Sequence, residues 1–149
     1  MALHRYIFVS LLLAGTAHAG DELRIVLLDS KTGHALRGKL VCIAFPAGAS
    51  ADPVITQPRD CRRTDSTGTA TFAMPDTAPE HINIMMGSDG LVGCFTQQAF
   101  ATDEAMTMGV VVDNTCGDAS TETTQPGEVV VFAHQTSVWE ALKARRNEF

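Results

Sequence analysis

The sequence predicts an all-β fold, an antiparallel Greek-key β-sandwich of about seven strands with a short C-terminal helix. Short apolar or alternating runs recur along the chain, and turn-forming residues separate each run from the next. No helical pattern is evident between these runs, and seven or eight short strands at such spacing are typical of a sandwich rather than of an α/β fold.

The N-terminus has the pattern of a cleavable export signal. Arg5 supplies a positive start, residues 7–14 form an apolar run, and Ala17-His18-Ala19 has the small-x-small form that signal peptidase cleaves. We therefore expect a signal peptide over residues 1–19 and a single domain over residues 20–149. The apolar run is too short to cross a bilayer, so we expect a periplasmic or secreted protein with no membrane insertion.

The charge of the expected mature chain argues against two classes of partner. Removal of Arg5 with the signal leaves ten Lys and Arg residues against seventeen Asp and Glu, a formal net charge of −7. Nucleic acids and anionic membrane surfaces attract proteins with basic patches, so neither is an expected partner.

The first predicted strands lie in the N-terminal half of the chain. Leu23–Leu28 is an apolar run that ends at a cluster of turn formers, and Leu40–Phe45 is a second run that ends before Pro46. Thr69–Met74 alternates between apolar and small polar residues, which predicts a half-buried strand. Asp65 to Gly68 precede it, so we expect this strand to close a hairpin with Arg59–Thr64.

The later strands are predicted by the same signals. His81–Met86 alternates, and Leu91–Phe95, Met106–Val112 and Val129–Ala133 are further short strand candidates. Turn-forming residues separate all of them, and the intervening chain shows no internal repeat.

The tail changes to a helical period. Ser137 and Glu140 stand three apart, as the N-cap and N3 residues of a capping box do. Trp139 and Leu142 then share one helix face. A helix this short does not persist alone in water. We expect it to dock on the sandwich; an undocked helix would make Trp139 and Leu142 candidates for an interaction surface.

Three stretches form a pattern: Val26-x-x-Asp29-x-x-Thr32-Gly33-x-x-Leu36-x-Gly38-x-x-Val41, then Thr64-Asp65-x-x-Gly68, and an ending with Pro126-Gly127-Glu128-Val129-Val130-Val131-Phe132 and Trp139-Glu140-x-Leu142. This pattern resembles the carboxypeptidase regulatory-like domain, a transthyretin-like (prealbumin-type) β-sandwich. Stand-alone secreted bacterial members end in a similar way. The commonest form of the family lacks cysteines and has Gly-Tyr where this chain has Gly90-Leu91.

The resemblance implies a non-catalytic module that acts in protein or envelope interaction. Enzymes of the same fold class use residues that this chain does not supply. Hydroxyisourate hydrolases end in Tyr-Arg-Gly-Ser, whereas this chain ends in Arg146-Asn147-Glu148-Phe149; intradiol dioxygenases need two tyrosines, and the only tyrosine, Tyr6, lies in the signal. We therefore expect no catalytic residue and no cofactor.

Four cysteines, Cys42, Cys61, Cys94 and Cys116, predict two disulfides in an exported protein. Pairing Cys42 with Cys61 and Cys94 with Cys116 is favoured, because each bridge then ties successive strands across one long, irregular loop. Nested pairing, Cys42 with Cys116 and Cys61 with Cys94, is the main alternative. A loop of about twenty residues gives a bridge worth about 3 kcal/mol.

Metal binding is a less favoured interpretation of the sequence than a non-catalytic interaction module. Met85, Met86, Met106 and Met108 lie on adjacent strand candidates near His81, and thioethers with imidazole suit copper. Methionine also fills cores routinely, so a periplasmic copper or small-ligand protein is the second reading. Asp113, Asn114 and Asp118 could suggest calcium, although a solvated turn fits their spacing better. The mature chain's other histidines, His34 and His134, like His81, are expected at strand ends or in loops facing solvent.

Overall fold

The computed structural model describes residues 22–45 and 60–137, apart from 88, 98 and 122. The predicted signal peptide and the predicted C-terminal helix, with Trp139 and Leu142, lie outside the described residues. The elements are β1 (Glu22–Asp29), β2 (Leu40–Ala44), β3 (Asp60–Arg63), β4 (Thr69–Ala73), β5 (His81–Met86), β6 (Leu91–Gly93), β7 (Ala99–Ala101), α1 (Thr102–Thr107), β8 (Val110–Val111) and β9 (Glu128–Gln135).

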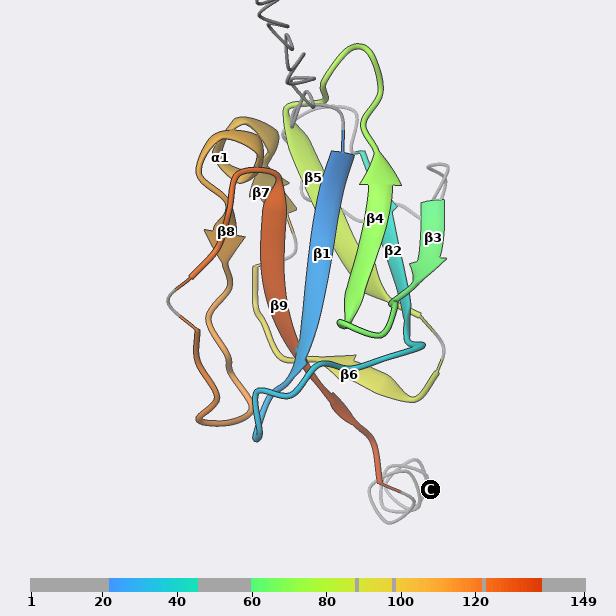
Figure 1. Ribbon diagram of the computed structural model, residues 1–149, viewed down its shortest axis with the longest axis vertical. Helices are drawn as coiled ribbons and strands as arrows, with labels where there is room; N and C mark the ends of the chain where they lie inside the picture. The colour runs from blue at the N-terminus through green and yellow to red at the C-terminus, as the bar shows by residue number, and fades with distance from the viewer. Residues whose placement is uncertain (1–21, 46–59, 88, 98, 122, 138–149) are drawn as a thin grey trace, which may run out of the picture.

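Two sheets pack face to face, which confirms the predicted all-β sandwich (Figure 1). The first sheet has the strand order β4-β1-β9-β6, with β8 also paired to β9, and the second has the order β3-β2-β5-β7. Alternate side chains of each strand point inward, as Leu23, Ile25 and Leu27 of β1 do. Phe72 from the first sheet and Phe100 from the second are both buried in the core between them.

The centre of the first sheet differs from the antiparallel arrangement that the sequence predicts. β1 and β9 run parallel, in register from Arg24 opposite Glu128 to Asp29 opposite Ala133. β8 is also parallel to β9, whereas β6 is antiparallel to it and pairs nearer its C-terminal end. Turn signals concern strands that are neighbours along the chain, so they carry no information about how the first and last strands pair.

The expected hairpin between Arg59–Thr64 and Thr69–Met74 is wrong. β3 pairs with β2 in the second sheet, and β4 pairs with β1 in the first. The turn at Asp65 to Gly68 therefore carries the chain from one sheet to the other. Gly68 has φ 78° and its N–H donates to the carbonyl of Asp65, so the turn is where the sequence places it, but its two arms separate.

The predicted strand Met106–Val112 is largely wrong as well. The chain forms α1 first, and only Val110–Val111 are extended. Asp103 and Glu104 occupy the first turn of α1, where carboxylates favour a helix. Gly109, with φ 78°, ends it, and the carbonyl of Glu104 accepts hydrogen bonds from the N–H groups of Met108 and Gly109. A short apolar run such as Met106–Val112 fits a strand and a helix equally well. β7 is a further difference, because the sequence does not predict a strand there.

Two disulfides join the pairs that the sequence favours. Cys42 and Cys61 face each other in register on β2 and β3. Cys94, which follows β6, is joined to Cys116 in the connection between β8 and β9. The sequence predicts a long, irregular loop between Cys94 and Cys116, but this segment contains β7, α1 and β8.

Within the part of the chain that the structure describes, no helix has the length and apolar character needed to cross a membrane.

Candidate functional site

An open groove lies where the C-terminal end of β5 meets the chain at the end of β6. It has a volume of about 240 Å³, and its lining side chains are apolar: Ile84, Met85, Met86 and Phe95, together with Gly93. Sites for small molecules usually enclose about 300–1,000 Å³. The groove is therefore smaller than such sites, and its size suits one or two apolar side chains.

Gly93 keeps this groove open. A Cβ atom at Gly93 would stand 2.8 Å from the ring of Phe95 and 3.4 Å from Cγ of Met86. A side chain at this position would therefore project among the groove residues. Gly93 also pairs with Ala133 of β9, so the residue is held in the first sheet while its open side faces Met86 of the second.

Among the residues that the structure describes, one edge of β5 has no strand partner beside the groove. β2 pairs with β5 from Asn83 to Met86, whereas β7 pairs only with His81 to Asn83. Within the described residues, no strand pairs with the β7-side edge of β5 beyond Asn83. A strand edge without a strand partner, next to a groove lined by apolar side chains, is the arrangement to which an extended peptide adds as a further strand.

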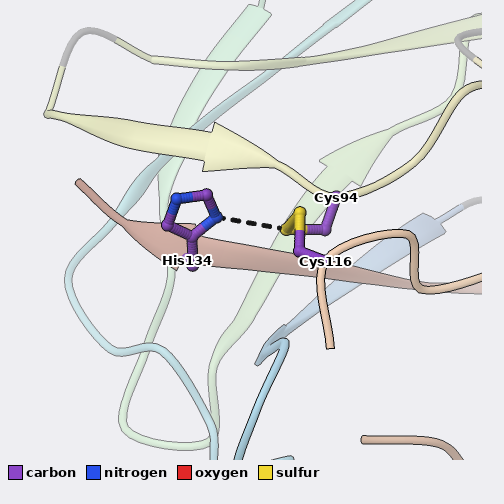
Figure 2. A group of neighbouring side chains, drawn as sticks. All are labelled: Cys94, Cys116 and His134. Carbon is purple, nitrogen blue, oxygen red and sulfur yellow. Dashed lines mark hydrogen bonds between the residues drawn. A yellow bond between two sulfur atoms is a disulfide. The ribbon is translucent and has the colours of Figure 1, made fainter. Parts of the chain in front are cut away.

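A second group of side chains gathers around the Cys94–Cys116 bridge (Figure 2). Val92 and His134 are opposite each other on β6 and β9, and Cys94 lies two residues beyond Val92. Nδ1 of His134 lies 3.4 Å from Sγ of Cys94, and the ligand-type atoms of the three residues Cys94, Cys116 and His134 are all within 4.8 Å of one another. In the closed bridge each sulfur is bonded to the other, so neither is a thiolate that could hold a metal.

The loop that carries Cys116 is anchored to the end of β1. Nδ2 of Asn114 donates to the carbonyls of Ser30, at 2.6 Å, and of Ala119, at 2.9 Å. Oδ1 of Asn114 accepts from the N–H of Cys116 at 3.1 Å. A Cβ atom at Gly117 would collide with the carbonyl of the fully buried Ser30, so the loop backbone lies directly on β1's end.

The side-chain amide of Asn114 also bears on the calcium hypothesis for Asp113, Asn114 and Asp118. Both polar atoms of the Asn114 side chain are engaged within the protein, while Asp113 and Asp118 are exposed. The arrangement is that of a solvated, internally bonded loop.

The residues of the copper hypothesis do not come together. Met85 and Met86 end β5, whereas His81 begins it. Met106 lies in α1 and Met108 just after it, so neither lies on a strand, contrary to the expectation from the sequence. α1 follows β7, which pairs with the His81 end of β5, so Met106 and Met108 lie away from Met85 and Met86. Met106 and Met86 instead pack partly against the apolar core.

The three histidines of the described chain have different settings. His34 is exposed, in agreement with the prediction of a solvent-facing loop residue, and His81 is half-buried at the start of β5. His134 is also half-buried, and its contact with a disulfide was not predicted.

Three carboxylates have lowered pKa values, and each fixes a turn or a strand end. The backbone N–H of Thr32 is the main cause of the lowered pKa of Asp29. The hydroxyl of Thr67 is the main cause for Asp65, and the backbone N–H of Leu40 for Asp89. These hydrogen bonds favour the ionised carboxylate, and they identify structural rather than catalytic roles.

Comparison with known proteins identifies no family. The chain matches no family model, and none of the curated proteins matches it. Among solved structures it is similar to the full-length major pilin SpaD from Corynebacterium diphtheriae, with 15% sequence identity and a TM-score of 0.47. The similarity covers 79% of this chain and 30% of the pilin chain, so this chain spans less than a third of that protein. The resemblance to carboxypeptidase regulatory-like domains stays a prediction.

Proposed function

We propose that this protein is a non-enzymatic, exported β-sandwich that binds an extended segment of a partner protein in the groove between β5 and β6. The observation that carries the proposal is that, within the described residues, no strand pairs with the edge of β5 beside the groove, whose lining side chains are apolar. The backbone edge supplies hydrogen-bonding groups that any extended chain can use, and the groove selects for an apolar side chain.

The size of the groove favours a peptide over a free small molecule. At about 240 Å³ it accepts a side chain and leaves the rest of a ligand outside. A peptide gains further contacts along the strand edge, so a shallow groove is sufficient for it.

The cysteines support an exported location. Disulfides persist in oxidising compartments, and both bridges join cysteines of the domain that we assign to residues 20–149. Cleavage of residues 1–19 as a signal peptide would deliver this domain to the periplasm or the outside of the cell.

The assignment to the carboxypeptidase regulatory-like family is part of the proposal. Its motif residues Asp29 and Asp65 each cap a turn, and Gly33, Gly38 and Gly68 have positive φ values of 70°, 66° and 78°. Only glycine adopts such values freely, which gives a physical reason for the glycines of the motif.

The test is affinity capture: immobilised variants of this protein are exposed to the native exported proteins, and the proteins that each variant retains are compared. Wild-type residues 20–149 are immobilised beside Gly93→Leu, which fills the groove, and Thr71→Leu, which places the same side chain on the exposed face of β4. Mass spectrometry identifies the proteins that each variant retains. We expect wild type and Thr71→Leu to retain the same proteins and Gly93→Leu to lose them. A photo-crosslinker in place of Met85 should attach to the same proteins.

The control is that all variants unfold at similar temperatures. Recovery of the same proteins by folded Gly93→Leu would contradict the proposal.

A further inference from the structure

The two cysteines of the Cys94–Cys116 bridge differ in their exposure to solvent. Cys94 is fully buried, with 0% of its surface exposed, whereas Cys116 lies in an exposed position of its loop. An incoming thiolate must approach along the axis of the bond that it breaks, so it reaches Sγ of Cys116 and displaces Sγ of Cys94.

The sulfur that would leave is the one beside an imidazole. Nδ1 of His134 lies 3.4 Å from Sγ of Cys94 (Figure 2). An N–H at Nδ1 donates to a thiolate that forms there, and thiols next to a protonated histidine have lowered pKa values. A leaving thiol with a lower pKa departs faster. The carbonyl of Val92, 3.7 Å from the same sulfur, can accept from the Cys94 thiol once a proton has been transferred.

We propose that Cys94–Cys116 is a thiol-exchange site, cleaved and re-formed by a dithiol oxidoreductase, with His134 assisting the departure of Cys94. A thiolate of the reductant attacks Sγ of Cys116, an S–S bond forms between them, and the bond between Cys116 and Cys94 breaks. Its electron pair remains on Cys94, which takes a proton from the imidazolium of His134, and the proton that the attacking thiol loses restores that imidazolium. The second thiol of the reductant then attacks the mixed disulfide and releases the Cys116 thiol, so the reductant leaves as a disulfide.

The rest of the Cys116 loop is held independently of the bridge. Asn114 remains bonded to Ser30, and the N–H of Ala119 also donates to the carbonyl of Ser30 at 3.2 Å. Cys94 keeps its backbone bonds to Phe132 and Thr115. Opening the bridge therefore leaves its two cysteines near each other, and the exchange is reversible without unfolding.

The second bridge provides an internal comparison. Cys42–Cys61 also has one buried and one exposed cysteine, but it links neighbouring strands within a sheet. Among the described residues, cysteine, histidine and carboxylate groups gather in threes only at Cys94, Cys116 and His134. Exposure of the cysteines is thus similar for the two bridges, which differ in their place in the fold and in the imidazole beside Cys94.

The experiment measures the reduction of each bridge in the folded, oxidised protein. Reduced glutathione is added, samples are quenched and alkylated at intervals, and peptide mass spectrometry follows both bridges in wild type, His134→Leu and the control His34→Leu. We expect Cys94–Cys116 to open faster than Cys42–Cys61 in wild type and His34→Leu. His134→Leu should slow the opening of Cys94–Cys116 roughly tenfold, because the leaving thiolate then lacks a donor beside it. The rate for Cys42–Cys61 should not change.

The position of the mixed disulfide tests the direction of attack. Early samples should carry glutathione on Cys116 and not on Cys94. Equal rates for the two bridges in wild type, an unchanged Cys94–Cys116 rate in His134→Leu, or glutathione on Cys94 would each overturn the proposal.

Discussion

Single aspartates determine where this chain turns. Oδ1 of Asp65 accepts hydrogen bonds from the N–H groups of Thr67 and Thr69 and from the hydroxyl of Thr67, at 2.7 to 3.0 Å. Asp29 makes the corresponding bonds with Lys31 and Thr32. An ionised carboxylate is the better acceptor, so these bonds hold the pKa of each aspartate below its ordinary value.

The Asp65→Asn variant tests this effect through its pH dependence. A carboxyl whose folded-state pKa is lowered stabilises the protein above its unfolded pKa, and that contribution is lost as the pH falls through the folded pKa. Asparagine keeps an acceptor oxygen but not the charge. We therefore expect Asp65→Asn to unfold at lower urea concentration than wild type at pH 7, with the difference shrinking as the pH falls below the ordinary pKa of 3.8.

Asp76→Asn serves as the control, because Asp76 is exposed and its carboxylate makes no hydrogen bond with the described residues. A difference between Asp65→Asn and wild type that is the same at every pH would contradict this interpretation.

At the residue scale, the sequence predicts those features that depend on residues close to one another along the chain. The turn formers after Leu28, the turn at Asp65 to Gly68 and the favoured cysteine pairs follow from local spacing. The role of His134 does not, because its partner Cys94 is 40 residues away and their contact depends on the register between β6 and β9. Nothing around His134 in the sequence distinguishes it from a histidine that faces solvent.

At the scale of elements, one side chain makes several of the bonds that hold the connection between β8 and β9. Asn114 satisfies three backbone groups, on Ser30, Ala119 and Cys116. These bonds fix the loop against the end of β1, and they place Cys116 within reach of Cys94.

Asn114→Ala should therefore lower the free energy of unfolding by about 1–3 kcal/mol, since it leaves partly buried backbone groups without partners. Asp113→Ala, at the exposed neighbouring position, should change it by no more than about 0.5 kcal/mol. Urea unfolding of both variants in the oxidised state gives the comparison. Equal stability of the two variants would show that the amide does not anchor the loop.

The elements that were predicted wrongly share a physical cause. The strand signals of β1, β2, β5 and β9 are runs long enough for their period to be evident. β7 has three residues and β8 two, which is too short for any period. α1 could have been recognised from Asp103 and Glu104 at its start and Gly109 at its end, which are helix start and stop signals. The groove between β5 and β6 depends on the packing of two sheets and has no local signal.

For the whole molecule, each disulfide closes a loop of similar length. The paired cysteines are 19 residues apart for Cys42–Cys61 and 22 apart for Cys94–Cys116. The entropy that such loops remove from the unfolded chain depends only weakly on their length.

We expect the double variants Cys42→Ala/Cys61→Ala and Cys94→Ala/Cys116→Ala each to lose about 3 kcal/mol of stability in urea unfolding. This is a large part of the roughly 5–15 kcal/mol that stabilises a typical domain. Because the two loops do not overlap along the chain, the losses should be nearly additive when both bridges are removed. A loss of under about 1 kcal/mol from either pair would show that its bridge does not stabilise the fold through loop entropy.

The parallel pairing of β1 with β9 also determines how this protein responds to tension. The chain enters the first sheet at Glu22 and leaves it at Gln135, and the two strands lie side by side with the same direction. A pull on the two ends therefore drags β1 and β9 past each other along their length. The hydrogen bonds of the six registered pairs bear that shear together, whereas a hairpin pulled at its open end would lose its bonds one after another. Forced unfolding is governed by the rate of the first rupture, so this geometry gives the sandwich mechanical resistance along the line that joins its ends.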